Sequence, residues 1–317
     1  MTKRIFSLVL AFLLLLPLSL VQTTAASANE ATIEGVTLHV GATLEARFYI
    51  SAPANSLEVG ISVGDTRIKG EPAEDGKWVA SLTGISAVDL GAVYEIVPYH
   101  FLTKRVEGDP YRFSVQDYAT RLLNRADTSE TARAALVALL NFGAACQMGA
   151  ESYVHNLPNE YLSETDKVVP EGTYESHFTF EGVGGVEGGY EDTMISIVFV
   201  DALMFKVSAN ITEALDGILS LEMADNPDFE NSSVYEMKKD SKTGLYEATT
   251  DGIYLNALSR VYYVRINRGN RLGKTFTYSV ESYCYEILRE DSEVESSEFK
   301  KSFAHAMMAL SRALNAM

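Results

Sequence analysis

Apolar and polar residues alternate along two long stretches of the chain, 32–114 and 193–278. In the run 44–50, for example, apolar residues occupy every second position. A period of two is typical of a strand with one buried face. After residue 50, the strands expected in the first stretch are 57–63, 66–69, 77–82, 93–100 and 111–113. About seven short strands separated by turn residues predict an antiparallel sandwich of immunoglobulin-like type.

Each strand-rich stretch is followed by apolar residues at helical spacing. Residues 113–147 and 278–314 each predict two helices joined by a short acidic turn. Ser114 and Ser279 stand where each pair begins, and a hydroxyl there accepts the unpaired backbone N–H groups of the first turn. The expected fold is mainly β with α, as two tandem immunoglobulin-like β-sandwich units, each followed by a two-helix hairpin.

The two halves also resemble each other in sequence. The helix starts at Ser114 and Ser279 match at a constant shift of 165 (279 − 114), and residues 76–98 match 244–266 without a gap. Earlier, Val36–Phe48 has the same apolar alternation as Ile195–Val207. This similarity predicts an internal repeat. Residues 210–239, rich in Asp, Glu and Asn, are expected to be an insertion in the second copy.

The first 28 residues have the features of a secretory signal peptide. Lys3 and Arg4 precede the apolar run 5–16, and the small residues 26–28 close the segment. The run is short for a membrane span, which needs about 20 residues. We therefore expect a secreted or envelope-associated chain that is not an integral membrane protein. The expected domains are a signal peptide at 1–28, a first module at 29–150, a linker at 151–172 and a second module at 173–317.

Charge and cysteine content narrow the possible partners and cross-links. The formal net charge is −17, and an acidic surface repels phosphate backbones, which excludes nucleic acid as a partner. Export would permit a disulfide between the two cysteines, Cys146 and Cys284. They occupy unrelated positions in apolar helical stripes, which favours two buried free thiols over a bridge.

Few residues suggest catalysis or metal binding. The five histidines are scattered without the spacing of a metal site, and neither cysteine has the local context of a nucleophile. With 43 acidic residues, a carboxylate pair at glycosidase distance can arise anywhere, so abundance is uninformative. The densest acidic cluster, Asp225, Asp228 and Glu230, offers oxygen ligands for calcium, but its spacing matches no EF-hand and favours a solvated loop. No cofactor is expected.

Aromatic residues are the better candidates for a contact surface, because the chain has 17 tyrosines. Half of each strand's side chains must face inward. The aromatic residues that recur in both copies are expected in the core: Trp78, Tyr94, Tyr246 and Tyr262. The candidates for an exposed ligand-binding surface are then Tyr49, Tyr99, Tyr254 and Tyr263.

Two runs in the first half, FSVQDYATRLL at 113–123 and LVALLNFGAACQ at 136–147, resemble a module of secreted and surface proteins of Gram-positive gut anaerobes. In that module a β-sandwich ends in a Tyr-Ser-Val-x-x-Tyr helix, followed by a helix of the form LVKALLNYGAAAQ. The second half resembles the partner module of the same proteins through GLYEATTDGIYLNAL at 244–258 and FTYSVESYCYEIL at 276–288. The last helix and the segment after Asn210 depart from the pattern.

This module often accompanies adhesive or wall-associated domains and has no established catalytic residues. The resemblance therefore implies an extracellular location and a binding or structural role, and it transfers no site residue. Together with the residue patterns, it favours a non-catalytic, adhesin-like protein that recognises a glycan or an extracellular protein at the cell surface. A structural spacer of an envelope assembly is the alternative, and a carboxylate-dependent glycoside hydrolase is less favoured. The oligomeric state is left open.

Overall fold

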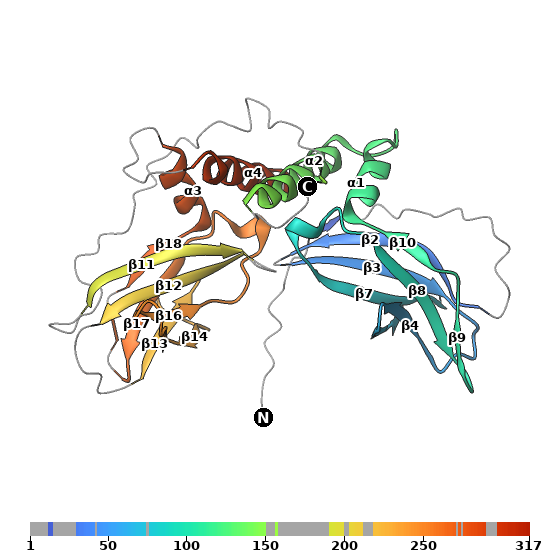
Figure 1. Ribbon diagram of the computed structural model, residues 1–317, viewed down its shortest axis with the longest axis horizontal. Coiled ribbons are helices and arrows are strands. Elements are labelled where there is room, and N and C mark those ends of the chain that lie inside the picture. The colour runs from blue at the N-terminus through green and yellow to red at the C-terminus, as the bar shows by residue number, and fades with distance from the viewer. Residues whose placement is uncertain are drawn as a thin grey trace. The chain divides into compact units, whose positions relative to one another are not determined.

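The computed structural model describes residues 12–14, 30–41, 43–73, 76–149, 156–157, 190–199, 203–211, 218–270, 272–273, 275–289 and 297–317. These residues are mainly β, and they form four antiparallel sheets and four α-helices (Figure 1). Within them, no helix is both long and apolar enough to cross a membrane. The chain divides into two compact units, which are unit 1 (1–161 with 313–317) and unit 2 (162–312).

Unit 1 contains two sheets. The first has the strand order β1 (Phe12–Leu14), β2 (Thr32–Val40), β3 (Leu44–Ser51), β7 (Trp78–Ile85), β6 (Glu71–Pro72). The second has the order β10 (Tyr111–Phe113), β8 (Tyr94–Phe101), β4 (Glu58–Val63), β5 (Thr66–Lys69), with β9 (Arg105–Glu107) also paired to β8. Their apolar faces meet where Phe48 contacts Phe113, with ring centroids 5.3 Å apart. The alternation in the sequence thus supplies one buried face to each sheet.

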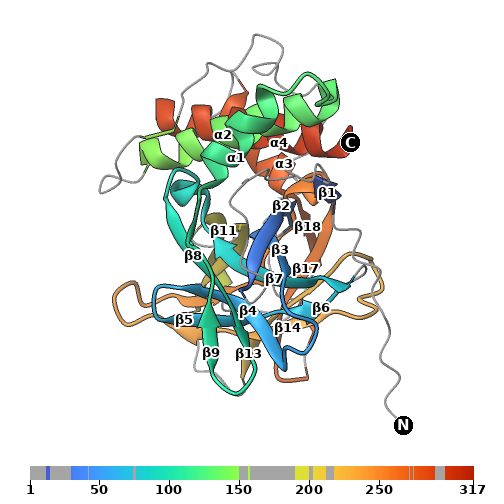
Figure 2. The same ribbon diagram turned by 90° about the vertical axis from the view of Figure 1, so that its right-hand side faces the viewer.

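Two helices follow the sheets of unit 1, α1 (Val115–Leu123) and α2 (Glu130–Gly149), and both lie at one end of them (Figures 1 and 2). The Ser114 hydroxyl accepts a hydrogen bond from the Asp117 N–H at 3.0 Å, so the expected N-cap is present. Arg133 of α2 donates to the carbonyls of Leu123, the last residue of α1, and of Arg125 in the turn that follows. The guanidinium therefore joins the two helices of the hairpin.

The C-terminal half of α2 contains the run LVALLNFGAACQ at 136–147. Two of its residues, Gly143 and Gln147, hold the helix against its neighbours. Gly143 lies so close to the short 3₁₀ helix η2 (Ala87–Asp89) that a Cβ there would be 2.9 Å from the Ala87 carbonyl. The buried Gln147 amide donates to the Val88 carbonyl at 2.8 Å and accepts from Leu157 N–H at 3.3 Å. These two contacts hold α2 against η2.

Unit 2 also contains two sheets. The first has the order β11 (Tyr190–Phe199), β12 (Leu203–Ile211), β16 (Tyr246–Thr249), β15 (Lys238–Lys239). The second has the order β14 (Ser233–Glu236), β13 (Leu219–Ala224), β17 (Tyr262–Arg268), β18 (Phe276–Tyr278). Phe205 contacts Tyr278 and Tyr262 across the sheets, with ring centroids 5.2 and 5.7 Å apart. The chain continues through α3 (Val280–Leu288), capped by Ser279, and α4 (Glu298–Asn315).

Strand pairing in the two units follows the same register. The pairing series Val36, Phe48, Ala80 of unit 1 has the counterpart Ile195, Val207, Ala248 in unit 2. The short helix η3 (Leu255–Ala257) stands 168 positions after η2, the shift at which residues 76–98 match 244–266. Gly76 and Gly244 both have positive φ, 71° and 76°, at equivalent hairpins. Residues at equivalent positions of the two units can therefore be compared directly.

Residues 210–239 are not an insertion as a whole, so that expectation was wrong. They contain β13, β14 and β15, which pair as β4, β5 and β6 do in unit 1. Leu221 pairs with Tyr235, 14 positions later, whereas Ile61 pairs with Ile68, seven positions later. The extra length lies in the loop 225–232. Its many acidic residues obscured short strands whose partners are distant in sequence.

The strands expected between residues 57 and 113 are present with ends shifted by up to three residues, and β6 and β9 are additional. Of the expected signal peptide, only 12–14 are described, as a strand paired with Leu38–Val40. Apart from Asn156 and Leu157, the expected linker at 151–172 lies outside the described residues.

Candidate functional site

Polar and aromatic side chains from four segments of unit 2 gather near the start of β17. We call Asp225, Tyr235, Asp251, Arg260 and Tyr262 the Tyr235 cluster. The Tyr235 hydroxyl donates to the Asp251 carboxylate at 3.1 Å and accepts from the Asp251 N–H at 3.3 Å. Arg260 and Asp225 form an ion pair at 3.6 Å, and both side chains are more than half exposed. The cluster therefore presents charges of both signs beside two tyrosines.

Local structure holds Tyr235 and Asp251 in place. Tyr235 pairs with Leu221 and packs its ring against the core of unit 2, so only its hydroxyl end reaches Asp251. The buried Thr250 hydroxyl accepts from Phe205 N–H and donates to the Asp251 carbonyl, both at 3.0 Å. A rigid tyrosine body and an anchored aspartate give the cluster a defined geometry before any ligand arrives.

The loop 225–232 positions Asp225. The Asn226 side chain donates to the Glu230 carbonyl and accepts from the Glu230 N–H, both at 2.9 Å. Phe229 has a φ of 56°, which is uncommon for a bulky residue, and its ring is buried beneath the Arg265 guanidinium, 3.8 Å from the ring centroid. This internal bonding makes the loop a fixed support for Asp225.

The tyrosines of the cluster are neutral at physiological pH. Burial is the main cause that raises the pKa of Tyr235, and the hydrogen bond to the Asp251 carboxylate adds to it. Burial likewise raises the pKa of Tyr262, on which the charges of Arg260 and Asp225 also act. Neutral phenols can donate and accept hydrogen bonds. The arrangement can bind hydroxyl-rich ligands through mixed donors and acceptors.

Unit 1 lacks most of this cluster at the equivalent positions. Tyr94 corresponds to Tyr262 in the common register, and Asp65 stands two positions after Val63 of β4 as Asp225 stands two after the equivalent Met223 of β13. The counterparts of Tyr235, Asp251 and Arg260 are Ile68, Thr83 and Ala92. The common scaffold therefore carries Tyr235, Asp251 and Arg260 in unit 2 only, whereas Tyr262 and Asp225 have counterparts in both units.

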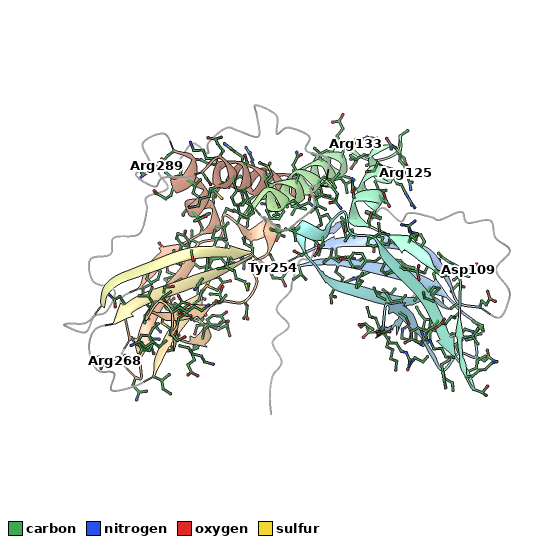
Figure 3. The ribbon with its side chains drawn as sticks, in the orientation of Figure 1. Asp109, Arg125, Arg133, Tyr254, Arg268 and Arg289 are labelled. Carbon is green, nitrogen blue, oxygen red and sulfur yellow. The ribbon has the colours of Figure 1, made fainter. Side chains whose placement is uncertain are left out.

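The expected contact tyrosines do not gather into one surface. Tyr254, labelled in Figure 3, stands at the start of η3. It is 37% exposed and lies three residues after Asp251 in the sequence. Tyr49 and Tyr263 are only half-exposed. The residues expected in the core are partly buried, and of these Tyr246 and Tyr262 pack against the core of unit 2. Two of the four expected contact residues thus adjoin the Tyr235 cluster along the chain, Tyr254 near Asp251 and Tyr263 directly after Tyr262.

The expectation that the Tyr99 ring is exposed was wrong, because Tyr99 is only 3% exposed. It faces outward from β8, as expected, but it lies over Gly60 of β4, and its hydroxyl donates to Glu58 at 3.1 Å. The Arg105 guanidinium covers the ring at 5.0 Å from its centroid. A glycine on the neighbouring strand leaves room for a flat aromatic ring, which sequence alternation alone does not reveal.

A second polar cluster of unit 2 is a structural ion pair. The Glu222 carboxylate accepts from Arg265, Asn267 and Ser232, each at 2.7 Å. Burial alone would raise the pKa of Glu222, but these hydrogen bonds, led by Arg265, outweigh it and lower the pKa. A general acid needs a raised pKa. Glu222 is therefore unsuited to the acid role in glycoside hydrolysis.

The weak metal candidates do not form a site. No group of three or more His, Cys, Asp or Glu side chains with the geometry to hold a metal ion occurs among the described residues. Asp225 pairs with Arg260, and the Glu230 backbone is bonded to Asn226. Asp225, Asp228 and Glu230 therefore belong to a loop closed by its own hydrogen bonds.

Both cysteines are free and buried, as the sequence favoured. Burial raises the pKa of each thiol, which leaves almost no nucleophilic thiolate. We expect neither Cys146 nor Cys284 to react with a maleimide in the folded protein, and both to react in denaturant, as counted by mass spectrometry. Rapid single labelling of the folded chain would contradict this expectation.

The chain matches no protein-family model, and a search of curated proteins finds no significant similarity to it.

Proposed function

We propose that this chain is a secreted, non-catalytic binding protein made of two copies of an immunoglobulin-like sandwich with a helical hairpin, and that its second copy recognises a neutral glycan through the Tyr235 cluster. The observation that carries the proposal is the presence of Tyr235, Asp251 and Arg260, the residues that complete the cluster, in only one of two units with the same strand register. Residues that serve the fold recur in both units, as Ser114 and Ser279 do. Residues that occur in one unit alone are free to serve recognition.

The chemistry of the cluster favours a carbohydrate. Sugar hydroxyls bind well to carboxylate and guanidinium groups, and hydrogen bonds to charged partners are the stronger kind. Asp225, Asp251 and Arg260 are exposed enough to make them. The net charge of −17 disfavours an anionic glycan, so the proposed ligand is neutral.

The described carboxylates support a non-catalytic role. Each one with a resolved shift has a pKa lower than its ordinary value: Glu45, Asp127, Glu222 and Asp240. Glycoside hydrolysis requires one carboxylic acid whose pKa is raised, together with a second carboxylate at a set distance. None of these four carboxyl groups has a raised pKa.

The test is saturable binding of residues 29–317 to mucin, insoluble neutral plant polysaccharides and cell walls at low and high salt. Asp225→Ala and Arg260→Ala should each weaken binding to the neutral polysaccharide about tenfold, because one charge-assisted hydrogen bond contributes about 1.4 kcal/mol. Both side chains are exposed, so the fold should survive.

The matched control is Asp65→Ala, which removes the equivalent exposed carboxylate of unit 1 and should leave binding unchanged. Binding to a neutral glycan should also be nearly independent of salt, since no ion is displaced. Equal loss in Asp65→Ala and Asp225→Ala, or no loss in either, would argue against the Tyr235 cluster. Salt-sensitive capture by cell walls alone would point to a charged partner instead.

A further inference from the structure

Each unit exposes apolar side chains at one end of its sandwich, opposite the end at which the following helix begins. In unit 1, α1 follows β10, which pairs with the start of β8 at Tyr94, whereas Phe101 ends β8. In unit 2, α3 follows β18, which pairs with the start of β17 at Tyr262, whereas Arg268 ends β17. Figure 3 shows Arg268 at this end of unit 2. We call Leu57, Phe101 and Lys104 the unit 1 tip, and Ile218, Arg268 and Leu272 the unit 2 tip.

The apolar members of the tips are among the most exposed in the described part of the chain. Ten large apolar side chains are exposed there, and four of them belong to the tips, with exposed fractions between 41% and 73%. Single exposed apolar residues are ordinary on a protein surface. A pair of them at the equivalent end of each of two copies indicates a contact surface instead.

Backbone hydrogen bonds fix the position of each tip. In unit 1 the Leu57 N–H donates to the Phe101 carbonyl at 2.8 Å, and in unit 2 the Gly269 N–H donates to the Ile218 carbonyl at 2.9 Å. The loop after β17 is closed by a 3.1 Å hydrogen bond from its backbone to the buried side chain of Asn267. Each tip therefore presents its apolar side chains without a rearrangement of the sheet.

Positive charge accompanies the apolar side chains, although the chain as a whole carries −17. In unit 1, Glu107 neutralises Arg105 in an ion pair at 2.8 Å, and the neighbouring Lys104 is exposed. The sequence 268–274 of unit 2 contains three basic residues and no acidic residue, against one acidic residue in 214–218. Apolar side chains beside lysine and arginine are the features that attach a soluble protein to an anionic lipid surface.

We propose that the two tips bind the surface of an anionic lipid membrane, with their apolar side chains among the headgroups and their basic side chains beside the phosphates. The Glu58 carboxylate, next to Leu57, is turned toward the Tyr99 hydroxyl at 3.1 Å, which lies over Gly60 and away from the tip. The net charge of −17 repels such a surface, but at about 0.15 M salt charges beyond about 8 Å are largely screened. The charges at the tips then decide the interaction.

This surface is separate from the proposed glycan site. The Tyr235 cluster lies near the start of β17, whereas the unit 2 tip lies at the other end of the same strand. Loss of glycan binding and loss of lipid binding can therefore be measured independently, and failure of one proposal leaves the other standing.

The experiment is cosedimentation of residues 29–317 with vesicles of phosphatidylcholine, with or without phosphatidylglycerol, at about 0.15 M salt. This range omits the apolar run 5–16, which would itself bind lipid. We expect binding to the anionic vesicles and little to the neutral ones. Leu57→Asp and Ile218→Asp should each weaken it at least about tenfold, because each removes an apolar contact and adds a repelled charge. Both side chains are exposed, so the fold should survive.

Matched controls place the same charge on exposed valines away from the tips. Val93→Asp, at the start of β8, and Val234→Asp, on β14, should leave vesicle binding unchanged. Lys104→Gln should weaken binding to the anionic vesicles about fivefold. No binding to either vesicle would overturn the proposal and indicate that the tips contact another protein. Equal binding to both vesicles, or equal loss in the valine controls, would also overturn it.

Discussion

Glu222→Ala is expected to destabilise unit 2 by about 3 kcal/mol, near the lower end of the range for breaking a buried ion pair. The carboxylate accepts three hydrogen bonds at 2.7 Å, and its loss leaves the Arg265 guanidinium without its charge partner. The side chains of Glu222 and Arg265 are 12% and 17% exposed, so little water replaces the lost interaction. The loop 225–232 should loosen as well, because Ser232 loses its acceptor.

The same ion pair should make unit 2 sensitive to acid. A carboxyl group with a lowered folded-state pKa stabilises the fold fully above its ordinary pKa of 4.5 and loses that contribution as the pH falls through the lowered value. The wild-type protein should therefore lose stability on acidification below about pH 4.5 more steeply than Glu222→Gln, which has no carboxyl group to titrate there.

Hydrogen exchange of the β13 and β17 amides measures this effect within unit 2 without assuming that the whole chain unfolds in one step. Glu236→Ala is the matched control, since it removes an exposed carboxylate from β14 of the same sheet and should change stability by less than about 0.5 kcal/mol. Equal effects of the two substitutions would show that the hydrogen bonds to Glu222 contribute nothing beyond a surface charge.

Gly60→Ala should destabilise unit 1 by about 3 kcal/mol through steric overlap between neighbouring strands. A Cβ at this position would collide with the Ile68 carbonyl oxygen of β5 and approach the Tyr99 hydroxyl to 2.8 Å. The carbonyl is backbone and cannot move without breaking the pairing of β4 with β5. The Tyr99 ring would also have to leave Arg105, which now covers it.

The matched control is Ser220→Ala, the equivalent position of unit 2, where β13 already carries a side chain. It should change stability by no more than about 0.5 kcal/mol. Hydrogen exchange of β4 and β5, compared with that of β13 and β14, separates the two units. A Gly60→Ala protein whose β4 and β5 amides exchange as slowly as those of the wild type would contradict the expectation.

Local sequence signals were most reliable where a feature depends on neighbouring residues. The N-caps at Ser114 and Ser279 are present, since a hydroxyl and the N–H groups it accepts lie within one helical turn. The positive φ at Gly76 and Gly244 similarly follows from short hairpins. The two buried free thiols agree with the apolar helical stripes in which Cys146 and Cys284 stand.

Errors arose where a feature depends on residues far apart in the chain. The sequence pattern predicts an insertion where β13 and β14 lie, because these strands are defined by pairing with β17 and with each other rather than by strong alternation. Tyr99 was placed on the correct face of β8, but its burial depends on Gly60 of another strand and on Arg105 of a third. Alternation predicts the direction of a side chain and not what covers it.

The pattern of apolar residues and the match between the halves were sufficient to predict a mainly β chain with helices, the capped helix starts and two buried thiols, because these follow from short-range spacing. The Tyr235 cluster was not predictable in this way. Tyr235 meets Asp251 across 16 positions. Their contact depends on strand register, which pairing between distant segments decides.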